Sequence, residues 1–407
     1  MLRQARSELT LGVLIFLLPL LALPWAWQTA NTVWRPTSLR GVSVRALTAA
    51  SSEGLTILYA ETAAGGLWRS IDGGDTWARI DTSLPRGKWG SPSVVAVAAT
   101  PNEGRQVYIS LAGSGVDIYR SDDSGTHWRL SKGGLAPGEG KPLAVSAADP
   151  MTVYAGAGSR LFWSPDGGHL WLESEPWPGQ GMVTALAVSP DDPRTVYVGT
   201  DTGILFRSHD AGHVWEPLSL VYPDNLPAAV NAIAISSLRS RQLYVATGHG
   251  LLRSSDGGES WQVLGQDLPA RRSVSAIALD PLVQELLYVS VARAGVYRSQ
   301  DGGDSWEPLR AGLGRCTVSF LILDPGDRLA LYVGFDDGVW RMPLHSPQPT
   351  RYSSLVTCYS LVTVQTGEVR RGGAPPGKAL FQPLTCPVEY TFHRACLDSA
   401  QVLQRWS

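Results

Sequence analysis

The sequence has little net charge and few lysines. Its 34 basic and 36 acidic residues nearly cancel, which leaves a formal charge of −2. Proteins that bind nucleic acid by general electrostatic attraction present a basic face or arm, and a nearly neutral chain gives no overall reason to expect one. Only four of the basic residues are lysines. A charged partner would therefore have to be met by a local patch, and no nucleic-acid partner is predicted.

Cysteines and catalytic motifs are also scarce. The four cysteines are Cys316, Cys358, Cys386 and Cys396, and no two have the short C-x-x-C spacing of zinc or c-type haem sites. His393 lies between the last two, but one histidine at that spacing is a weak zinc signal. The chain also lacks G-x-S-x-G, H-E-x-x-H and Walker-type loops. We therefore predict no metal site and no cofactor.

An uncharged run of 19 residues lies near the amino terminus, at residues 9–27. It is long enough to cross a bilayer, and Trp25 and Trp27 at its far end suit an interfacial aromatic belt. Arg3 and Arg6 before it predict a cytoplasmic start. A cleaved secretory signal is the alternative interpretation. Both place the body of the protein outside the cytoplasm, and our prediction is a retained single-pass anchor in the cell membrane.

One eight-residue motif, S-x-D-x-G-x-x-W, recurs six times along the chain. It reads SIDGGDTW at 70, SDDSGTHW at 121, SPDGGHLW at 164, SHDAGHVW at 208, SSDGGESW at 254 and SQDGGDSW at 299. Its aspartates are Asp72, Asp123, Asp166, Asp210, Asp256 and Asp301, and its tryptophans are Trp77, Trp128, Trp171, Trp215, Trp261 and Trp306. A period near 45 residues, with four strand-like segments in each unit, predicts the blades of a β-propeller.

The motif itself could suggest a catalytic or metal-binding loop, but its repetition favours a structural role. A short Asp side chain can accept backbone N–H bonds within a turn, and Gly adopts the positive φ that other residues resist. The Trp then begins the next strand and can bury a large surface between blades. The spacing matches neither the EF-hand nor the RTX calcium motif. We interpret the six aspartates as turn residues between the third and fourth strands.

Seven apolar segments can serve as the first strands of such blades, starting at residues 44, 94, 142, 183, 230, 274 and 318. The seventh unit ends without a box, so its outermost strand must come from elsewhere. NTVWRPTSL (31–39) resembles DSWEPLRAGL, with Trp34 in the place of the box tryptophan. We predict that residues 33–37 supply the last strand of blade seven, which closes the ring and removes an exposed sheet edge.

With these boxes the chain resembles the Asp-box, or BNR-type, propellers over residues 31–344. That group includes sialidases, xyloglucanases, sortilin-like receptors and the photosystem II stability and assembly factors. The boxes specify the fold and leave the function open. The assembly factors are the most similar in plan, and this resemblance implies a single seven-bladed extracytoplasmic ring that binds other proteins. Their photosynthetic role is not carried over.

Hydrolysis is the alternative function. The F-R-I-P motif of sialidases is absent, and the chain is too short for the paired propellers of xyloglucanases. Arginines recur in the third strands, where we expect blade packing rather than a substrate triad: Arg69, Arg120, Arg207, Arg253, Arg298 and Arg341. Loop acids remain possible catalysts, because glycoside hydrolysis needs two facing carboxylates that sequence cannot place: Glu61, Asp201, Asp336 and Asp337. We predict a protein that is not an enzyme.

The loops opposite the boxes vary in length and sequence, as recognition loops on a rigid ring do. Their basic residues fall around blades five, six, seven and one: Arg40, Arg86, Lys88, Arg271, Arg272, Arg293, Arg310 and Arg315. Asp201 and Asp224 fall near blade four instead. We predict that this basic sector binds a partner; ordinary solvated loop charges are the other interpretation.

The predicted organisation is therefore all-β, with three parts. Residues 1–30 form the anchor or signal, residues 31–344 the seven-bladed ring, and residues 345–407 a small appendage stapled by a disulfide. Cys386 and Cys396 are the favoured pair, although four cysteines allow three connectivities. The predicted function is a non-catalytic, membrane-tethered scaffold or assembly factor for a membrane protein complex. The alternative is an Asp-box glycoside hydrolase, sialidase-like or carbohydrate-binding protein.

Overall fold

A computed structural model describes the central part of the chain. The described residues are 33–52, 54–84, 93–100, 105–112, 117–131, 142–175, 181–222, 226–269, 272–313, 316–325 and 330–344. Within these ranges, no helix is long and apolar enough to cross a membrane. The predicted amino-terminal anchor, the appendage and the pair Cys386–Cys396 lie outside the described residues.

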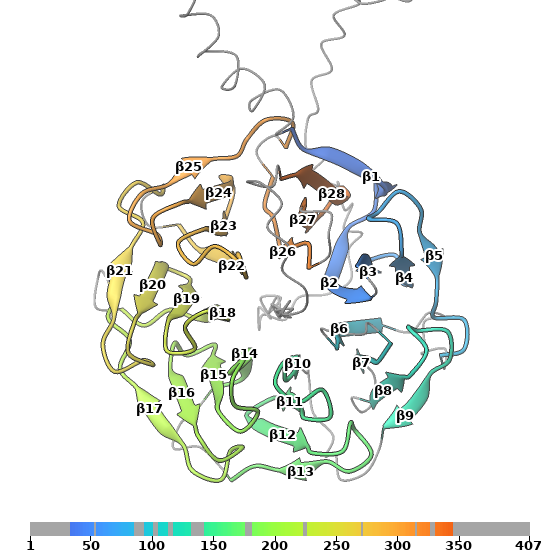
Figure 1. The fold of residues 1–407 in the computed structure, drawn as a ribbon, viewed down its shortest axis with the longest axis horizontal. Coiled ribbons are helices and arrows are strands. Elements are labelled where there is room, and N and C mark those ends of the chain that lie inside the picture. The colour runs from blue at the N-terminus through green and yellow to red at the C-terminus, as the bar shows by residue number, and fades with distance from the viewer. Residues whose placement is uncertain are drawn as a thin grey trace, which may run out of the picture. The chain divides into compact units, whose positions relative to one another are not determined.

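The described strands form seven four-stranded antiparallel sheets arranged as the blades of a ring (Figure 1). The all-β, seven-bladed propeller is confirmed. Blades 1 to 3 comprise β2(Val44–Ser52), β3(Leu55–Thr62), β4(Leu67–Ser70) and β5(Ala78–Arg79); β6(Ser93–Ala99), β7(Val107–Ala112), β8(Asp117–Ser121) and β9(Arg129–Ser131); and β10(Leu143–Val145), β11(Val153–Ala157), β12(Arg160–Ser164) and β13(Leu172–Glu173).

Blades 4 to 7 follow the same order, and the last one takes its fourth strand from the start of the chain. They comprise β14(Val183–Val188), β15(Val196–Thr200), β16(Leu205–Ser208) and β17(Glu216–Leu218); β18(Val230–Ile235), β19(Leu243–Thr247), β20(Gly250–Ser254) and β21(Gln262–Leu264); β22(Val274–Leu279), β23(Leu287–Val291), β24(Gly295–Ser299) and β25(Glu307–Pro308); and β26(Phe320–Leu323), β27(Ala330–Phe335), β28(Gly338–Pro343) and β1(Arg35–Arg40).

The inner strands are buried on both sides because each blade is covered by two neighbours. All five residues of β19, LYVAT, are buried, and so are all five of β15, VYVGT. Small and β-branched residues fit such stacked sheets. Each second strand contains one tyrosine, and six of these tyrosines are among the largest fully buried side chains: Tyr59, Tyr108, Tyr154, Tyr244, Tyr288 and Tyr332.

The closing strand lies two to three residues later than the sequence predicts. β1 spans Arg35–Arg40 rather than residues 33–37, and it pairs antiparallel with β28. The backbone N–H of Trp34 instead donates to Ala311 of blade 6, at 2.9 Å. That bond holds the chain against the neighbouring blade until residue 35, which is why pairing within blade 7 starts there.

The loops sort onto two faces. The box turns contact the loops between first and second strands, as in the 2.8 Å bond from Gly257 N–H to the Arg241 carbonyl. The loops between second and third strands contact the entry to the first strand, as in the 2.9 Å bond from Ala292 N–H to the Ser273 carbonyl. We call these the box face and the loop face. The outer strands run along the rim in Figure 1, since strand twist accumulates from the axis outwards.

Candidate functional site

The box aspartates are engaged within their own turns. In blade 5, Ser254 Oγ donates to Asp256 Oδ1 at 2.7 Å, and the Gly258 N–H donates to Ser254 Oγ at 2.8 Å. The Ser260 N–H donates to Asp256 Oδ1 at 3.0 Å. Bonds from the Ser260 hydroxyl and backbone hold the pKa of the Asp256 carboxyl below its usual range. Gly258 has φ of +102°, a conformation that side chains resist.

The same bond from serine to aspartate recurs in the other boxes, as expected for turn residues. The serine hydroxyl donates to the aspartate in each case, at 2.7 to 2.9 Å: Asp72, Asp123, Asp166, Asp210 and Asp301. In the described part of the chain, no group of three or more His, Cys, Asp or Glu residues could hold a metal ion. The box aspartates are therefore used within their own turns.

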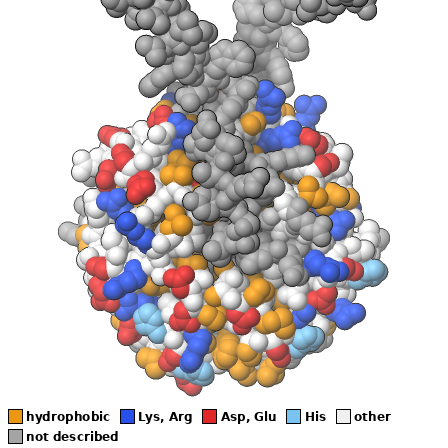
Figure 2. All heavy atoms as spheres, in the orientation of Figure 1, with side chains coloured by type: hydrophobic (Ala, Val, Ile, Leu, Met, Phe, Trp, Pro, Cys, Tyr) orange, Lys and Arg blue, Asp and Glu red, His pale blue; other side chains and the backbone are white. Residues whose placement is uncertain are grey.

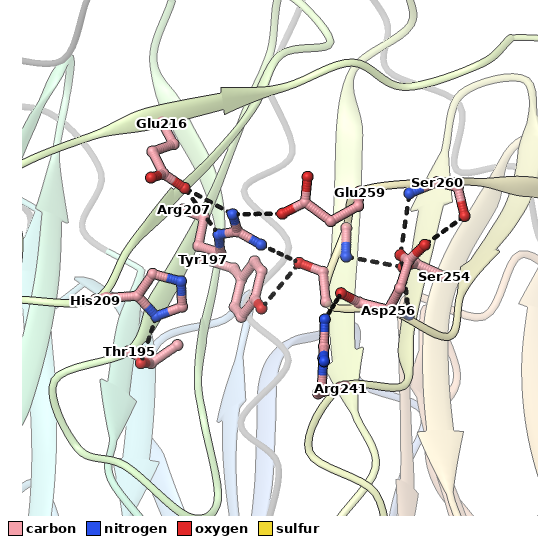
Figure 3. A network of polar contacts seen from close by, with 12 residues as sticks. Thr195, Tyr197, Arg207, His209, Glu216, Arg241, Ser254, Asp256, Glu259 and Ser260 are labelled. Atoms are coloured by element: carbon pink, nitrogen blue, oxygen red, sulfur yellow. Dashed lines mark hydrogen bonds and ion pairs between the residues drawn. The ribbon is translucent and has the colours of Figure 1, made fainter.

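A recurring arginine connects each blade to the next (Figure 3). In blade 4, Arg207 donates from Nη1 to the Gly257 carbonyl at 2.8 Å, and from Nη2 to Glu216 at 2.6 Å and Glu259 at 2.7 Å. Tyr197 donates its hydroxyl proton to the same Gly257 carbonyl, at 3.2 Å. We call this arrangement of arginine, tyrosine and box carbonyl the blade clamp.

The blade clamp repeats around the ring. In each case the arginine Nη1 donates to the carbonyl of the residue that follows the box aspartate of the next blade. The pairs are Arg69 to Ser124, Arg120 to Gly167, Arg253 to Gly302 and Arg341 to Gly73. The last of these crosses the joint between blades 7 and 1. Arg298 is the exception, because blade 7 has no box, and it pairs with Glu307 of its own blade. The recurring arginines are thus used in blade packing, as predicted.

Blade 3 replaces the arginine by Trp163. Its ring packs edge-on against His213 in the box of blade 4, with the centroids 6.3 Å apart and the planes at 81°. The position of His213 is the third residue after the box aspartate. In three boxes that face a clamp arginine, this position carries an acid that pairs with the arginine: Asp75, Glu259 and Asp304. Sequence reasoning missed this pairing, although the acid at this box position is readable from the repeat in three of the six boxes.

Box tryptophans form a second set of contacts between blades. The Trp128 Nε1–H donates to the Ile80 carbonyl at 2.8 Å, and the Trp215 Nε1–H donates to the Glu175 carbonyl at 3.0 Å. Trp34 makes the equivalent bond to the Leu309 carbonyl, at 2.8 Å. Trp34 therefore takes the structural place of a box tryptophan in blade 7.

The four loop acids proposed as alternative catalysts come from three different blades. Asp336 accepts a bond from the Ser43 hydroxyl at 3.0 Å, and Asp201 accepts one from the Met182 N–H at 2.7 Å. Asp337 follows Asp336 in the loop after β27. Glu61 is fully buried in blade 1, and neither of its carboxyl oxygens forms a hydrogen bond with the described residues. Burial raises the pKa of the Glu61 carboxyl to about 9, against the opposing charge of Arg45.

Four of the eight residues of the predicted basic sector lie in the described part of the chain. Arg40, Arg272, Arg293 and Arg310 are exposed on the loop face, whereas Arg86, Lys88, Arg271 and Arg315 lie outside the described residues. Arg272 Nη1 donates to the carbonyls of Ala292 and Arg293, at 3.2 and 3.3 Å, so two of these arginines adjoin. Arg310 Nη2 donates to the Tyr297 hydroxyl at 2.8 Å, and its guanidinium lies 5.8 Å from the ring centroid.

The box face and rim carry hydrophobic side chains at the opposite side of the ring from blade 7. In Figure 2 they gather at the lower edge, over the region of β12 and β13. Exposed side chains in blades 3 and 4 include Leu170, Leu172 and Val214. They project from box turns and an outer strand, and Glu173, next to Leu172 in β13, pairs with Arg160 of β12.

No protein-family model matches the chain, and no curated protein matches it. Solved structures share the fold. The GH74 xyloglucanase from Xanthomonas campestris has a TM-score of 0.62 at 20% identity, over 76% of this chain and 53% of its own. YCF48 from Cyanidioschyzon merolae has a TM-score of 0.59 at 15% identity, over 76% and 99%. YCF48 bound to D1 peptide has a TM-score of 0.59 at 13% identity, over 78% and 96%.

The chain is thus a seven-bladed propeller similar in structure to both YCF48 and a glycoside hydrolase, at low identity. It spans about half the length of the xyloglucanase and nearly the whole length of YCF48. Likeness at this identity concerns the fold, and the function has to be argued from the site.

Proposed function

We propose that the protein is a non-catalytic scaffold or assembly factor, tethered to a membrane and exposed outside the cytoplasm. Its loop face binds a subunit of a membrane protein complex. The observation that carries this proposal is the contrast between two sets of arginines. The third-strand arginines of the blade clamps are hydrogen-bonded to the next blade, as Arg207 and Arg253 are. By contrast, Arg40, Arg272 and Arg293 are exposed on the loop face.

Exposed arginine on a rigid surface suits recognition of another protein. The guanidinium is planar and always charged, and it offers several donors to carboxylates and backbone carbonyls. The ring holds the loops in fixed relative positions, so little ordering of the scaffold is needed on binding. The similarity in fold and length also supports this proposal. The match to the solved structure of YCF48 bound to D1 peptide extends over 96% of the YCF48 chain.

Affinity capture tests the proposal with two matched sets of variants. The test set is Arg40→Gln, Arg272→Gln and Arg293→Asn on the loop face; asparagine is chosen at 293 because φ is +58° there. The control set is Arg105→Gln, Arg194→Gln and Arg239→Gln, three exposed arginines of the box face. We expect the test set to lose most of the captured partner at unchanged melting temperature, and the control set to retain it. Equal capture by both sets would contradict the loop face as the binding surface.

A glycoside hydrolase is the second candidate, favoured by the structural similarity to the xyloglucanase. It requires two carboxylates that face each other across an open cleft. Incubating the purified protein with xyloglucan and with sialosides separates the two proposals. Release of reducing sugar that is abolished by Asp336→Asn or Asp201→Asn would favour the hydrolase.

A further inference from the structure

Glu61 occupies a position that is small in every other blade. In each second strand this residue faces the first strand of the next blade, and its counterparts are Ser110, Gly156, Gly199, Ala246, Ser290 and Gly334. The space there is tight. A Cβ at Gly199 would lie 2.3 Å from the Val230 side chain, and one at Gly334 would lie 3.0 Å from that of Val44. Blade 1 nevertheless places a full glutamate against blade 2.

The buried carboxyl is poorly compensated. The backbone N–H groups of Val94 and Thr62 lie near enough to lower its pKa, but neither completes a hydrogen bond to its two oxygens, and the side chain is completely inaccessible to solvent. A buried polar group without a partner costs free energy, and an ionised one costs far more. The group is therefore kept as the neutral acid while the joint is closed.

The charged groups that face Glu61 do not supply a dedicated partner. Arg45 comes from β2 and is exposed, and it acts on Glu61 only through its charge. Arg79 and Asp81, from the outer strand and the residue beyond it, form a two-bond ion pair with each other, at 2.6 and 2.9 Å. β6 contains no charged residue, and the one charged residue of β4, Arg69, donates to the Ser124 carbonyl.

Side-chain hydrogen bonds cross the inner part of three other joints, those of blades 4 and 5, blades 5 and 6, and blades 6 and 7. Thr184, Asn231 and Ser275 each donate a side-chain bond to a carbonyl of the next blade's first strand, at 2.6 to 2.9 Å. The matching residue of blade 1 is Arg45, for which the described residues show no such bond. The outer part remains fastened by Arg69 and Trp128. The described side-chain bonds of the joint between blades 1 and 2 thus lie on its outer side.

We infer that the inner side of the joint between blades 1 and 2 opens, and that this opening is coupled to loss of the Glu61 proton to water. Once water reaches the carboxyl, the group ionises as an ordinary glutamic acid does, and the carboxylate can pair with Arg45. Rising pH therefore favours the open joint. The closure of blade 7, where β1 pairs with β28, is instead held by backbone pairing and by the bond from the Thr37 hydroxyl to the Val339 carbonyl.

Hydrogen exchange at pH 6, 7 and 8, corrected for the intrinsic rate, tests this device on the whole protein. Peptides covering β3 and β6 report on the joint, and those covering β15 and β18 report on the equivalent joint of blades 4 and 5. Opening that releases one proton predicts that protection of β3 and β6 falls by about tenfold for each pH unit. Protection of β15 and β18 is expected to stay constant with pH.

Glu61→Gln is the decisive variant, because it keeps the shape of the neutral acid and cannot ionise. We expect it to fold and to abolish the pH dependence at β3 and β6. Glu61→Ser, which installs the residue of blades 2 and 6, is expected to protect the joint at every pH. A constant protection in the wild type, the same fall in Glu61→Gln, or an equal fall in all blades would overturn the inference.

Discussion

At the residue scale, one arginine position has two different roles within the same repeat. Arg207 is buried and bonds to two carboxylates and a carbonyl that belong to two blades. Arg298 holds the same place in blade 6 but pairs with a half-exposed glutamate in its own blade. Position in the repeat alone does not set the energetic value of the side chain. The next box does, because it provides the carbonyl and the second acid.

This difference predicts unequal costs for the same substitution. Arg207→Ala leaves a partly buried carbonyl and two acids without their donor, and we expect a loss of about 3 kcal/mol in the free energy of unfolding. Arg298→Ala removes an ion pair open to solvent, and we expect less than about 1 kcal/mol. Urea unfolding followed by tryptophan fluorescence measures both. Equal costs would show that the clamp does not connect the blades energetically.

At the element scale, the repeat made most strands predictable. The boxes and the seven first strands follow from residues that recur at a fixed spacing, and their local chemistry agrees with the fold. Two features were not accessible in the same way. The start of β1 depends on Trp34 bonding to blade 6, which is distant in sequence. The burial of Glu61 depends on how closely neighbouring blades pack, whereas the strand pattern alone predicts that it lies in a loop.

The closing element provides a second prediction. Trp34→Ala removes a buried ring and its bond to Leu309, and we expect a loss of about 3 to 5 kcal/mol. Trp34→Phe keeps most of the apolar contact and loses only the donor, at a cost of about 1 kcal/mol. Thermal unfolding of both variants measures the difference. A harmless Trp34→Ala would mean that the ring is not closed by the amino-terminal strand.

The box turn provides a third prediction, at acidic pH. The pKa of Asp256 is lower in the folded protein than in the unfolded chain, because Ser260 and Ser254 bond to its carboxylate. The stability that it contributes is present above the ordinary carboxyl pKa and is lost as pH falls through the lowered value. Asp256→Asn should cost about 1 kcal/mol at pH 7 and much less at pH 2. An equal cost at both pH values would show that the charge of Asp256 does not stabilise the turn and that its glycines alone do.

At the scale of the whole molecule, one joint of the ring, that between blades 1 and 2, contains a buried carboxyl, Glu61. The pKa of Glu61 is higher in the folded ring than in the unfolded chain. The stability linked to its proton is therefore complete below the ordinary carboxyl pKa and declines as pH rises towards about 9. The box aspartates have the opposite effect, because they stabilise the fold less as pH falls. Loss of stability at acidic pH therefore reports on the box turns, and loss of stability at alkaline pH reports on Glu61.

A fourth prediction follows for global stability. Between pH 5 and 8 the wild type should lose about 1.4 kcal/mol per pH unit relative to Glu61→Gln, since one proton is released on unfolding. Denaturant titrations of both proteins at several pH values give this difference directly. Parallel profiles would show that Glu61 is already ionised in the folded protein.

The whole-molecule account assigns packing to the third-strand arginines and partner binding to the loop face. Photo-crosslinking in membranes tests it most directly, with a crosslinking amino acid placed at position 40 or 293 on the loop face, or at position 194 or 239 on the box face. The account predicts that the two loop-face positions capture the same membrane-complex subunit and that the two box-face positions do not. Capture of that subunit from the box face instead would contradict it.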